Sequence, residues 1–126
     1  MFKYRRSITA LRVSSHNLEV EIGRYVQKKE AQVERNKRYC MLCLENNNCL
    51  LGDEIHAVFI CPTFDSSRNK LLKHMEDKYP NLKLLNDIDK LIYFLTCEND
   101  DINKISRYIH KILTYKRPKF NAYLVN

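Results

Sequence analysis

One run of cysteine and histidine residues constrains the fold of this chain more than any other feature. Residues 39–62 read YCMLCLENNNCLLGDEIHAVFICP, and Cys40, Cys43, His56 and Cys61 stand in the arrangement C-x2-C-x12-H-x4-C. Two thiolates separated by two residues can reach one ion from a tight turn, and zinc prefers four soft or borderline ligands in a tetrahedron. The spacing therefore predicts one structural Zn²⁺ ion, bound by these four side chains.

The residues between the two ligand pairs indicate how the chain brings the pairs together. Residues 46–48, all asparagine, and Gly52 are typical of a loop that reverses the chain. Asp53 can cap a short helix over 53–60 that presents His56, and Pro62 prevents that helix from continuing. A catalytic zinc would need an open coordination position and a nearby general base. Because four protein ligands close the site, we expect a structural ion and not a catalytic one.

The other interpretation of the run is a set of four buried side chains without a metal, with His56 as a hydrogen-bonded core histidine. Cys49 lies in the loop and could replace one of the ligands, but its neighbours Leu50 and Leu51 predict that it packs as a small hydrophobic residue. Cys97, far along the chain, is expected in the core.

The five cysteines cannot all pair, and the basic start MFKYRRSITALRV has no apolar signal region. We therefore expect a reducing, intracellular location, in the nucleus or the cytoplasm, without a disulfide framework.

The N-terminal part of the chain gives weaker structural patterns. Residues 7–13 could form two helical turns, with Ser7 as the cap and with Ile8 and Leu11 on one face. Residues 17–25 alternate apolar and polar side chains, which predicts a short extended segment. Residues 27–38 are polar and basic and predict an exposed connection or a frayed helix.

Three apolar stripes with helical spacing follow in the C-terminal half. The first helix is predicted over 66–79, with Leu71, Leu72, Met75 and Tyr79 on one face, and Pro80 ends it. The second is predicted over 87–97 with a core-facing stripe made of Ile88, Leu91, Ile92 and Leu95. The third begins after a cap at Asp100 or Asp101 and faces inward with Ile102, Ile105, Ile109, Ile112 and Leu113, whereas Lys104, Arg107 and Lys111 lie on its other side.

Together these patterns predict a mainly α fold: a small zinc-stabilised domain with a zinc knuckle, a short helix and a C-terminal tail of about three helices. We divide the chain into a basic N-terminal segment (1–36), a zinc-binding module (37–66) and a helical tail (67–126). With only 126 residues, these parts are expected to share one compact domain.

The net charge of +7 is concentrated at the two ends. Residues 1–40 hold ten Lys or Arg against four acidic residues, and residues 101–126 hold six against one. Basic surfaces attract polyanions, so nucleic acid, RNA or DNA, is the leading partner class, although a solvated basic surface without a partner is the alternative. Tyr25 and Tyr39 could stack on bases or simply pack. The candidate contacts to the nucleic-acid backbone are Arg5, Arg6, Arg12, Arg24, Lys28, Lys29, Lys37 and Arg38.

Composition excludes several other function classes. With two glycines, the chain has neither a dinucleotide-binding fingerprint nor a phosphate-binding P-loop. No apolar run reaches the 18 residues or so that a membrane-spanning helix needs. We expect neither a membrane nor a small-molecule substrate among the partners.

The motifs also resemble a known family. The stretches LRVSSHNLEVEIGRY, RYCMLC and DEIHAVFICPTFDSSRNKLL are similar to the zinc-binding domain that follows the reverse transcriptase in LINE-type (non-LTR) retrotransposon polyproteins. The resemblance covers about residues 6 to 75, and Asn17 departs from it where a basic residue is expected. The matching positions are Ser14, His16, Leu18, Gly23, Arg24, Tyr25, Cys40, Cys43, Asp53, Glu54, His56, Cys61, Pro62, Phe64 and Arg68.

This resemblance implies a non-catalytic tail that would hold element RNA or target DNA near the reverse transcriptase domain of a parent element. The pair Asp100–Asp101 lacks the preceding aromatic residue of a polymerase active site, which leaves helix capping as its interpretation. Two further hypotheses stay open. The chain could be a zinc-stabilised protein-interaction or structural module, or a decayed element fragment without function.

Overall fold

The computed structural model describes residues 2–12, 18, 27–28, 31–32, 38–45 and 49–125, and the described part is mainly helical. Two two-residue strands, β1 (Gln27–Lys28) and β2 (Ala31–Gln32), pair antiparallel. The α-helices are α1 (Phe2–Arg12), α3 (Met41–Leu44), α4 (Asp65–Lys78), α5 (Asp87–Thr96) and α6 (Asp101–Val125). A π-helix, η2 (His56–Ile60), and two 3-10 helices, η3 (Pro62–Phe64) and η4 (Pro80–Leu84), complete the elements.

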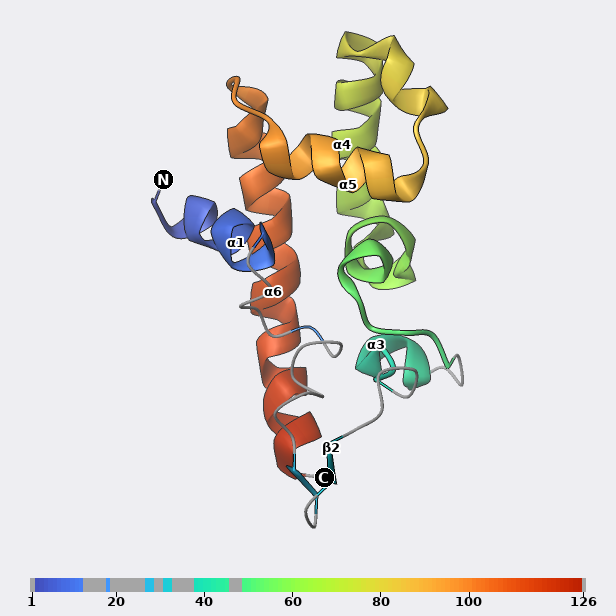
Figure 1. The fold of residues 1–126 in the computed structure, drawn as a ribbon, viewed down its shortest axis with the longest axis vertical. Coiled ribbons are helices and arrows are strands. Elements are labelled where there is room, and N and C mark those ends of the chain that lie inside the picture. Colours follow the sequence, from blue (N-terminus) through green and yellow to red (C-terminus); the bar gives the residue numbers. More distant parts are fainter. Residues whose placement is uncertain are drawn as a thin grey trace.

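Helix α6 is the element around which the others assemble, and it runs along most of the long axis of the molecule (Figure 1). Helices α1, α3 and α4 and the π-helix η2 all contact it. Ile105, Ile109 and Ile112 are buried on its inner side, whereas Lys104, Arg107 and Lys111 are exposed. The predicted inward face of this helix is therefore confirmed, and it forms the centre of one apolar core that includes residues from α1 to α6.

Helix α1 begins earlier than its sequence pattern predicts. Ile8 and Leu11 are buried against α6 as expected, but the helix starts at Phe2, so Ser7 lies in its interior and the cap predicted there is wrong. The Ser7 hydroxyl is hydrogen-bonded to His110 Nδ1 of α6 at 3.0 Å. A serine inside a helix is stable here because its hydroxyl has a partner on the neighbouring helix.

Helix α4 agrees with its prediction to within one residue at each end. Leu71 and Met75 are buried, Leu72 and Tyr79 are half-buried, and Pro80 begins the 3-10 helix η4 directly after the α-helix ends. Pro80 fits this position because proline lacks the N–H that an interior helical position requires but is suited to the first turn of a new helix.

Helix α5 begins at the predicted residue and ends one residue before the predicted end, but it has a different orientation. Ile88 and Ile92 are 63% and 54% exposed, so the predicted core-facing stripe is wrong at these two positions. Phe94 is buried instead, and its ring centre lies 5.4 Å from that of Phe59. Residues 92 and 94 point in directions about 200° apart on an α-helix, so burying the large Phe94 ring turns Ile92 outward.

The basic segment before the cysteines is only partly described. Within 27–38, Gln27 lies opposite Gln32 and Lys28 opposite Ala31 in the β1–β2 pair, so a frayed helix is the wrong interpretation of these residues. Within 17–25 only Leu18 is described, and it is buried; the predicted extended structure of that segment lies outside the described residues. Among the described helices, none is both long enough and apolar enough to cross a bilayer.

Candidate metal site

The first two cysteines are positioned by the two arms of a loop that pair with each other. Tyr39 and Leu51 form an antiparallel bridge, the Cys40 N–H donates to the Leu50 carbonyl at 2.7 Å, and the Gly52 N–H donates to the Arg38 carbonyl at 2.8 Å. Cys40 has an extended backbone (φ −60°, ψ 118°) and α3 begins immediately after it. Cys43 then lies in the first turn of α3, so both thiols come from one tight bend.

His56 and Cys61 are positioned by the π-helix η2. Asp53 Oδ1 accepts a hydrogen bond from the His56 N–H at 2.8 Å, which is the cap that the sequence predicts. The Cys61 N–H donates to the His56 carbonyl at 2.7 Å and closes a turn of five residues. On an α-helix, residues five apart would point about 140° away from each other. The wider turn allows the imidazole and the thiol to face the same point.

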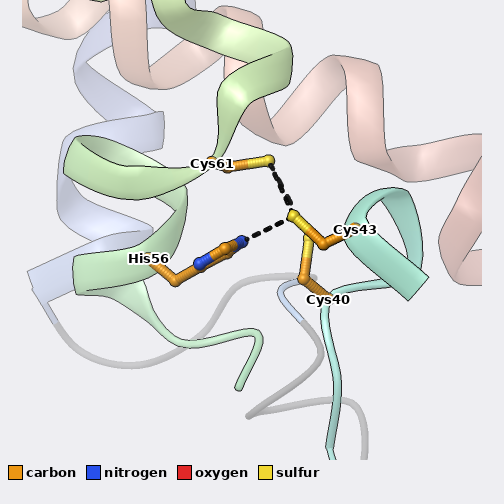
Figure 2. Close-up of side chains that lie close together, drawn as sticks. All are labelled: Cys40, Cys43, His56 and Cys61. Atoms are coloured by element: carbon orange, nitrogen blue, oxygen red, sulfur yellow. Dashed lines mark hydrogen bonds between the residues drawn. The ribbon is translucent and has the colours of Figure 1, made fainter. Parts of the chain in front are cut away.

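The four side chains meet in the interior of the protein (Figure 2). Cys40 and Cys61 are fully buried, and Cys43 and His56 are 3% and 4% exposed. The Cys61 sulfur lies 3.9 Å from the sulfurs of both Cys40 and Cys43, and the Cys43 sulfur lies 3.3 Å from His56 Nε2. All four ligand atoms lie within 4.8 Å of one another, so this group could hold a metal ion.

The cysteines of this group are not disulfide-bonded. A sulfur–sulfur bond is about 2.05 Å long, roughly half of the separation found here. The hydrogen bond with Cys40 and burial both raise the pKa of the Cys61 thiol above its ordinary value. Several thiolates cannot share so small a buried space unless positive charge lies between them, because like charges repel strongly where water is excluded.

Arg68 of α4 ties the ligand-bearing backbone to the helical core. This arginine is only 5% exposed; its Nε donates to the Val58 carbonyl at 2.9 Å, and another guanidinium nitrogen donates to the Cys61 carbonyl. Its third nitrogen pairs with Asp65 at 2.7 Å. Tyr108 of α6 donates its hydroxyl to the same Val58 carbonyl. Side chains from α4 and α6 thus hold the Val58 carbonyl, and a side chain from α4 holds the carbonyl of the ligand Cys61.

Sequence reasoning missed this role of Arg68, which entered only as one position of the family resemblance. A weak signal was present, because Arg68 stands in helical register with the buried Leu71 and Met75, where an unpaired charge would be costly. Nothing in the sequence near Tyr108 indicates that its hydroxyl would meet a carbonyl fifty positions earlier.

The two cysteines outside the group differ from each other. Cys97 is buried as predicted, and its thiol lies 3.2 Å from Asn99 Oδ1. Cys49 is exposed, and so is Leu50 at 42%, so the prediction that Cys49 packs inside is wrong. The backbone pairing of Leu50 with Cys40 accompanies this result, since the side chains of Cys49 and Leu50 both lie outside the core.

The predicted nucleic-acid contacts are only partly placed by the structure. Arg6 and Arg12 are exposed on α1, as a contact to phosphate requires. Arg38 is only 8% exposed, which corrects its assignment as a surface cation, and Tyr39 is half-buried in the bridge with Leu51. The structure describes only the backbone of Arg5 and Lys28. The other candidates lie outside the described residues: Arg24, Tyr25, Lys29 and Lys37.

Comparisons of the chain with protein-family models, with curated proteins and with solved structures found no match.

Proposed function

We propose that Cys40, Cys43, His56 and Cys61 bind one structural Zn²⁺ ion. The observation that carries this proposal is the spacing of the ligand atoms: two sulfur pairs lie 3.9 Å apart, one sulfur–nitrogen pair lies 3.3 Å apart, and all four atoms lie within 4.8 Å of one another. Zinc bonds of about 2.3 Å to sulfur and about 2.0 Å to nitrogen, arranged as a tetrahedron, require separations of about 3.8 Å and 3.5 Å. The group is therefore close to the size of a tetrahedral zinc site before any adjustment.

The chemistry of the donors supports the same ion. Thiolates and imidazole favour zinc and other soft or borderline metals, whereas magnesium and calcium favour oxygen ligands. Four protein ligands leave no coordination position for water, which supports a structural role. Metal binding of this kind contributes about 10–16 kcal/mol in small zinc domains, enough to order a segment made of short elements.

Native mass spectrometry, with and without a chelator, tests this proposal. We expect one zinc per chain, lost on chelation, and lost in Cys43→Ser and His56→Ala proteins. Cys49→Ser is the matched control, because Cys49 is exposed and outside the group. A Cys49→Ser protein that no longer binds zinc, or a His56→Ala protein that binds it normally, would show that the ligands are wrongly assigned.

We further propose that the protein is a non-catalytic nucleic-acid-binding module, similar to the zinc-binding tail of LINE-type retrotransposon polyproteins. The net charge of +7 and the exposed Arg6 and Arg12 support a polyanionic partner. The surroundings of Asp101 support a module without polymerase chemistry. Its carboxylate accepts hydrogen bonds from His74, Lys78 and Tyr79 at about 3 Å, which is a structural role.

A binding titration tests this second proposal. The zinc-loaded chain is titrated against single-stranded RNA, single-stranded DNA and duplex DNA at several salt concentrations. Binding through phosphates predicts that the logarithm of affinity falls linearly with the logarithm of salt concentration. A slope near zero for all three probes would contradict a nucleic-acid function.

One observation favours a protein-interaction module as the second candidate. Leu84, Ile88 and Ile92 are 84%, 63% and 54% exposed and lie on the neighbouring elements η4 and α5. Large exposed apolar side chains are a feature of surfaces that contact other proteins. A salt-independent interaction with a reverse transcriptase domain that Ile88→Gln and Ile92→Gln abolish would favour this candidate.

A further inference from the structure

Helices α4 and α6 pack side by side and leave an open groove of about 350 Å³ between them. None of the residues that line this groove in the described part of the chain is acidic. Its cationic side chains come from both helices and are all exposed: Lys70, Lys104, Arg107 and Lys111. The groove lies outside the set of basic residues that the sequence analysis selected, which all precede the metal site.

The positive charge of the groove follows from how α6 is oriented. Lys104, Arg107 and Lys111 are spaced three and four residues apart, so they share one face of the helix. Burial of Ile105, Ile109 and Ile112 on the inner side holds this face toward solvent. Seven residues of α-helix cover about 10.5 Å, so these cations extend along the groove instead of meeting at one point.

The one acidic residue of α6 does not line the groove, although it contacts one residue that does. Asp101 is buried and accepts hydrogen bonds from His74, Lys78 and Tyr79. The carboxylate thus pairs with His74 at the edge of the groove and with Lys78 and Tyr79 outside it, and none of these three partners is one of the four groove cations. Lys70 and Lys104 have no ion pair among the described residues.

Two buried residues that line the groove, Leu71 and Tyr108, form its floor, and Tyr108 is hydrogen-bonded to the backbone near the metal site. The Tyr108 hydroxyl donates to the Val58 carbonyl, and Arg68 donates to that carbonyl and to the carbonyl of Cys61. The Tyr108 ring is therefore fixed in place and is not available to stack on a base. The groove therefore offers a row of cations above buried side chains.

We propose that the α4–α6 groove binds the phosphodiester backbone of a nucleic acid. The inference rests on the proposed nucleic-acid function and names its contact surface. Amines and guanidinium groups in a row match a row of phosphates, which is the chemistry that RNA and DNA share. Such contacts provide affinity and salt dependence but little sequence specificity.

The test compares two pairs of charge reversals in the zinc-loaded full chain. Lys70→Glu with Lys104→Glu changes the groove, and Lys73→Glu with Lys83→Glu changes the net charge equally at exposed residues that do not line it. Affinity is measured by fluorescence anisotropy with a single-stranded RNA, a single-stranded DNA and a duplex DNA of equal length. We expect the groove pair to lose roughly tenfold or more in affinity at low salt, and the control pair to lose less than about threefold.

Replacing the two groove lysines by neutral residues measures how many phosphate contacts they make. Lys70→Gln with Lys104→Gln should reduce the steepness of the salt dependence by about 1.4 for a single strand, because each lost contact contributes about 0.7. The probe that shows the largest loss identifies RNA, single-stranded DNA or duplex DNA as the ligand. Zinc content and circular dichroism verify that the variants are folded.

The possible outcomes separate this inference from the function on which it rests. A wild-type protein that binds none of the three probes overturns both. A wild-type protein that binds, with a groove pair that loses no more affinity than the control pair, overturns the groove alone. Loss confined to the groove pair, together with the smaller salt dependence, establishes it.

Discussion

Residues 38–64 and residues 65–115 differ in what fills their interiors. In the first region the elements are at most five residues long, and its centre contains the polar ligand group of Cys40, Cys43, His56 and Cys61. In the second region long helices meet through large apolar side chains, among them Met75, Phe94 and Ile109. If the ligand group binds zinc as proposed, the ion stabilises the first region, whereas apolar burial stabilises the second.

The two regions are nevertheless joined at a few polar contacts. Arg68 and Tyr108, both from the helical region, hold the backbone of the ligand region at the Val58 carbonyl. On the proposed zinc binding, the ion and the apolar core stabilise different segments, and these buried hydrogen bonds connect the two segments.

The largest expected effect comes from removing the metal. We expect chelation to remove most of the proposed contribution of about 10–16 kcal/mol and to unfold residues 37–66, while the helical region keeps part of its helical circular dichroism. Hydrogen exchange before and after chelation, followed segment by segment, measures this difference. Equal loss of protection in α4 and α6 would break the comparison, because it would show that one interior cannot persist without the other.

The second effect is a cavity in the helical region. Phe94→Ala should cost about 3–5 kcal/mol of unfolding free energy, because the ring is buried and packs against Phe59. Ile92→Ala on the same helix is the matched control and should cost far less, since Ile92 is 54% exposed. Denaturant unfolding gives both values, and native mass spectrometry should show unchanged zinc binding for both variants. A large loss in the Ile92 variant would mean that α5 is oriented differently.

The third effect concerns the hydrogen bonds from Arg68 that connect the two regions. Arg68→Met removes the hydrogen bonds to the Val58 and Cys61 carbonyls but keeps much of the side chain volume. We expect zinc affinity to fall about 10–100-fold, as is typical when a group that orients a ligand is lost. Competition with a chelator measures the affinity. Lys73→Met, a change at an exposed residue of the same helix, should leave the zinc affinity unaltered. Equal zinc affinity in both variants would show that Arg68 does not position the ligand backbone.

The smallest effect is the pH dependence of the Asp101 cluster. Burial raises the pKa of this carboxyl, but hydrogen bonds from His74, Lys78 and Tyr79 outweigh burial and lower it from 3.8 to about 2. The ionised form is therefore favoured in the folded state. The stabilisation, about 2 kcal/mol, is present above pH 4 and is lost as the pH falls toward 2.

Comparison with Asp101→Asn isolates this contribution from the loss of metal in acid. Wild type should be more stable than the variant by about 2 kcal/mol at pH 6, and the difference should vanish near pH 2. Denaturant unfolding at several pH values measures it. A difference that does not change with pH would mean that the carboxylate charge contributes nothing there.

Much of this architecture could be predicted from residue spacing alone. The stripe at Ile105, Ile109 and Ile112 predicts the inner face of α6, and the bounds of α4 follow from its apolar spacing and from Pro80. The ligand spacing predicts which four residues meet, because two short local turns each bring a pair together. The cap at Asp53 was predictable for the same reason, since capping involves residues three positions apart.

Other features depend on contacts between residues far apart in the sequence. In α5 the pattern predicts an inward stripe with Ile88 and Ile92, but Phe94 is buried, since packing against Phe59 decides which face of a short helix turns inward. In the same way, the local sequence predicts Ser7 as a helix cap. The structure shows that its hydroxyl is hydrogen-bonded to His110, which is far away in the sequence.

The sequence by itself determined the local elements and the chemistry of the ligand group, because helical periodicity, capping and ligand spacing are properties of neighbouring residues. Only the tertiary structure decided that Arg68 holds the Cys61 carbonyl, that Cys49 lies outside, and that Lys70 and Lys104 border one groove. These positions follow from how helices and loop arms contact one another, and the free energy of those contacts comes from pairs of residues that the order of residues does not identify.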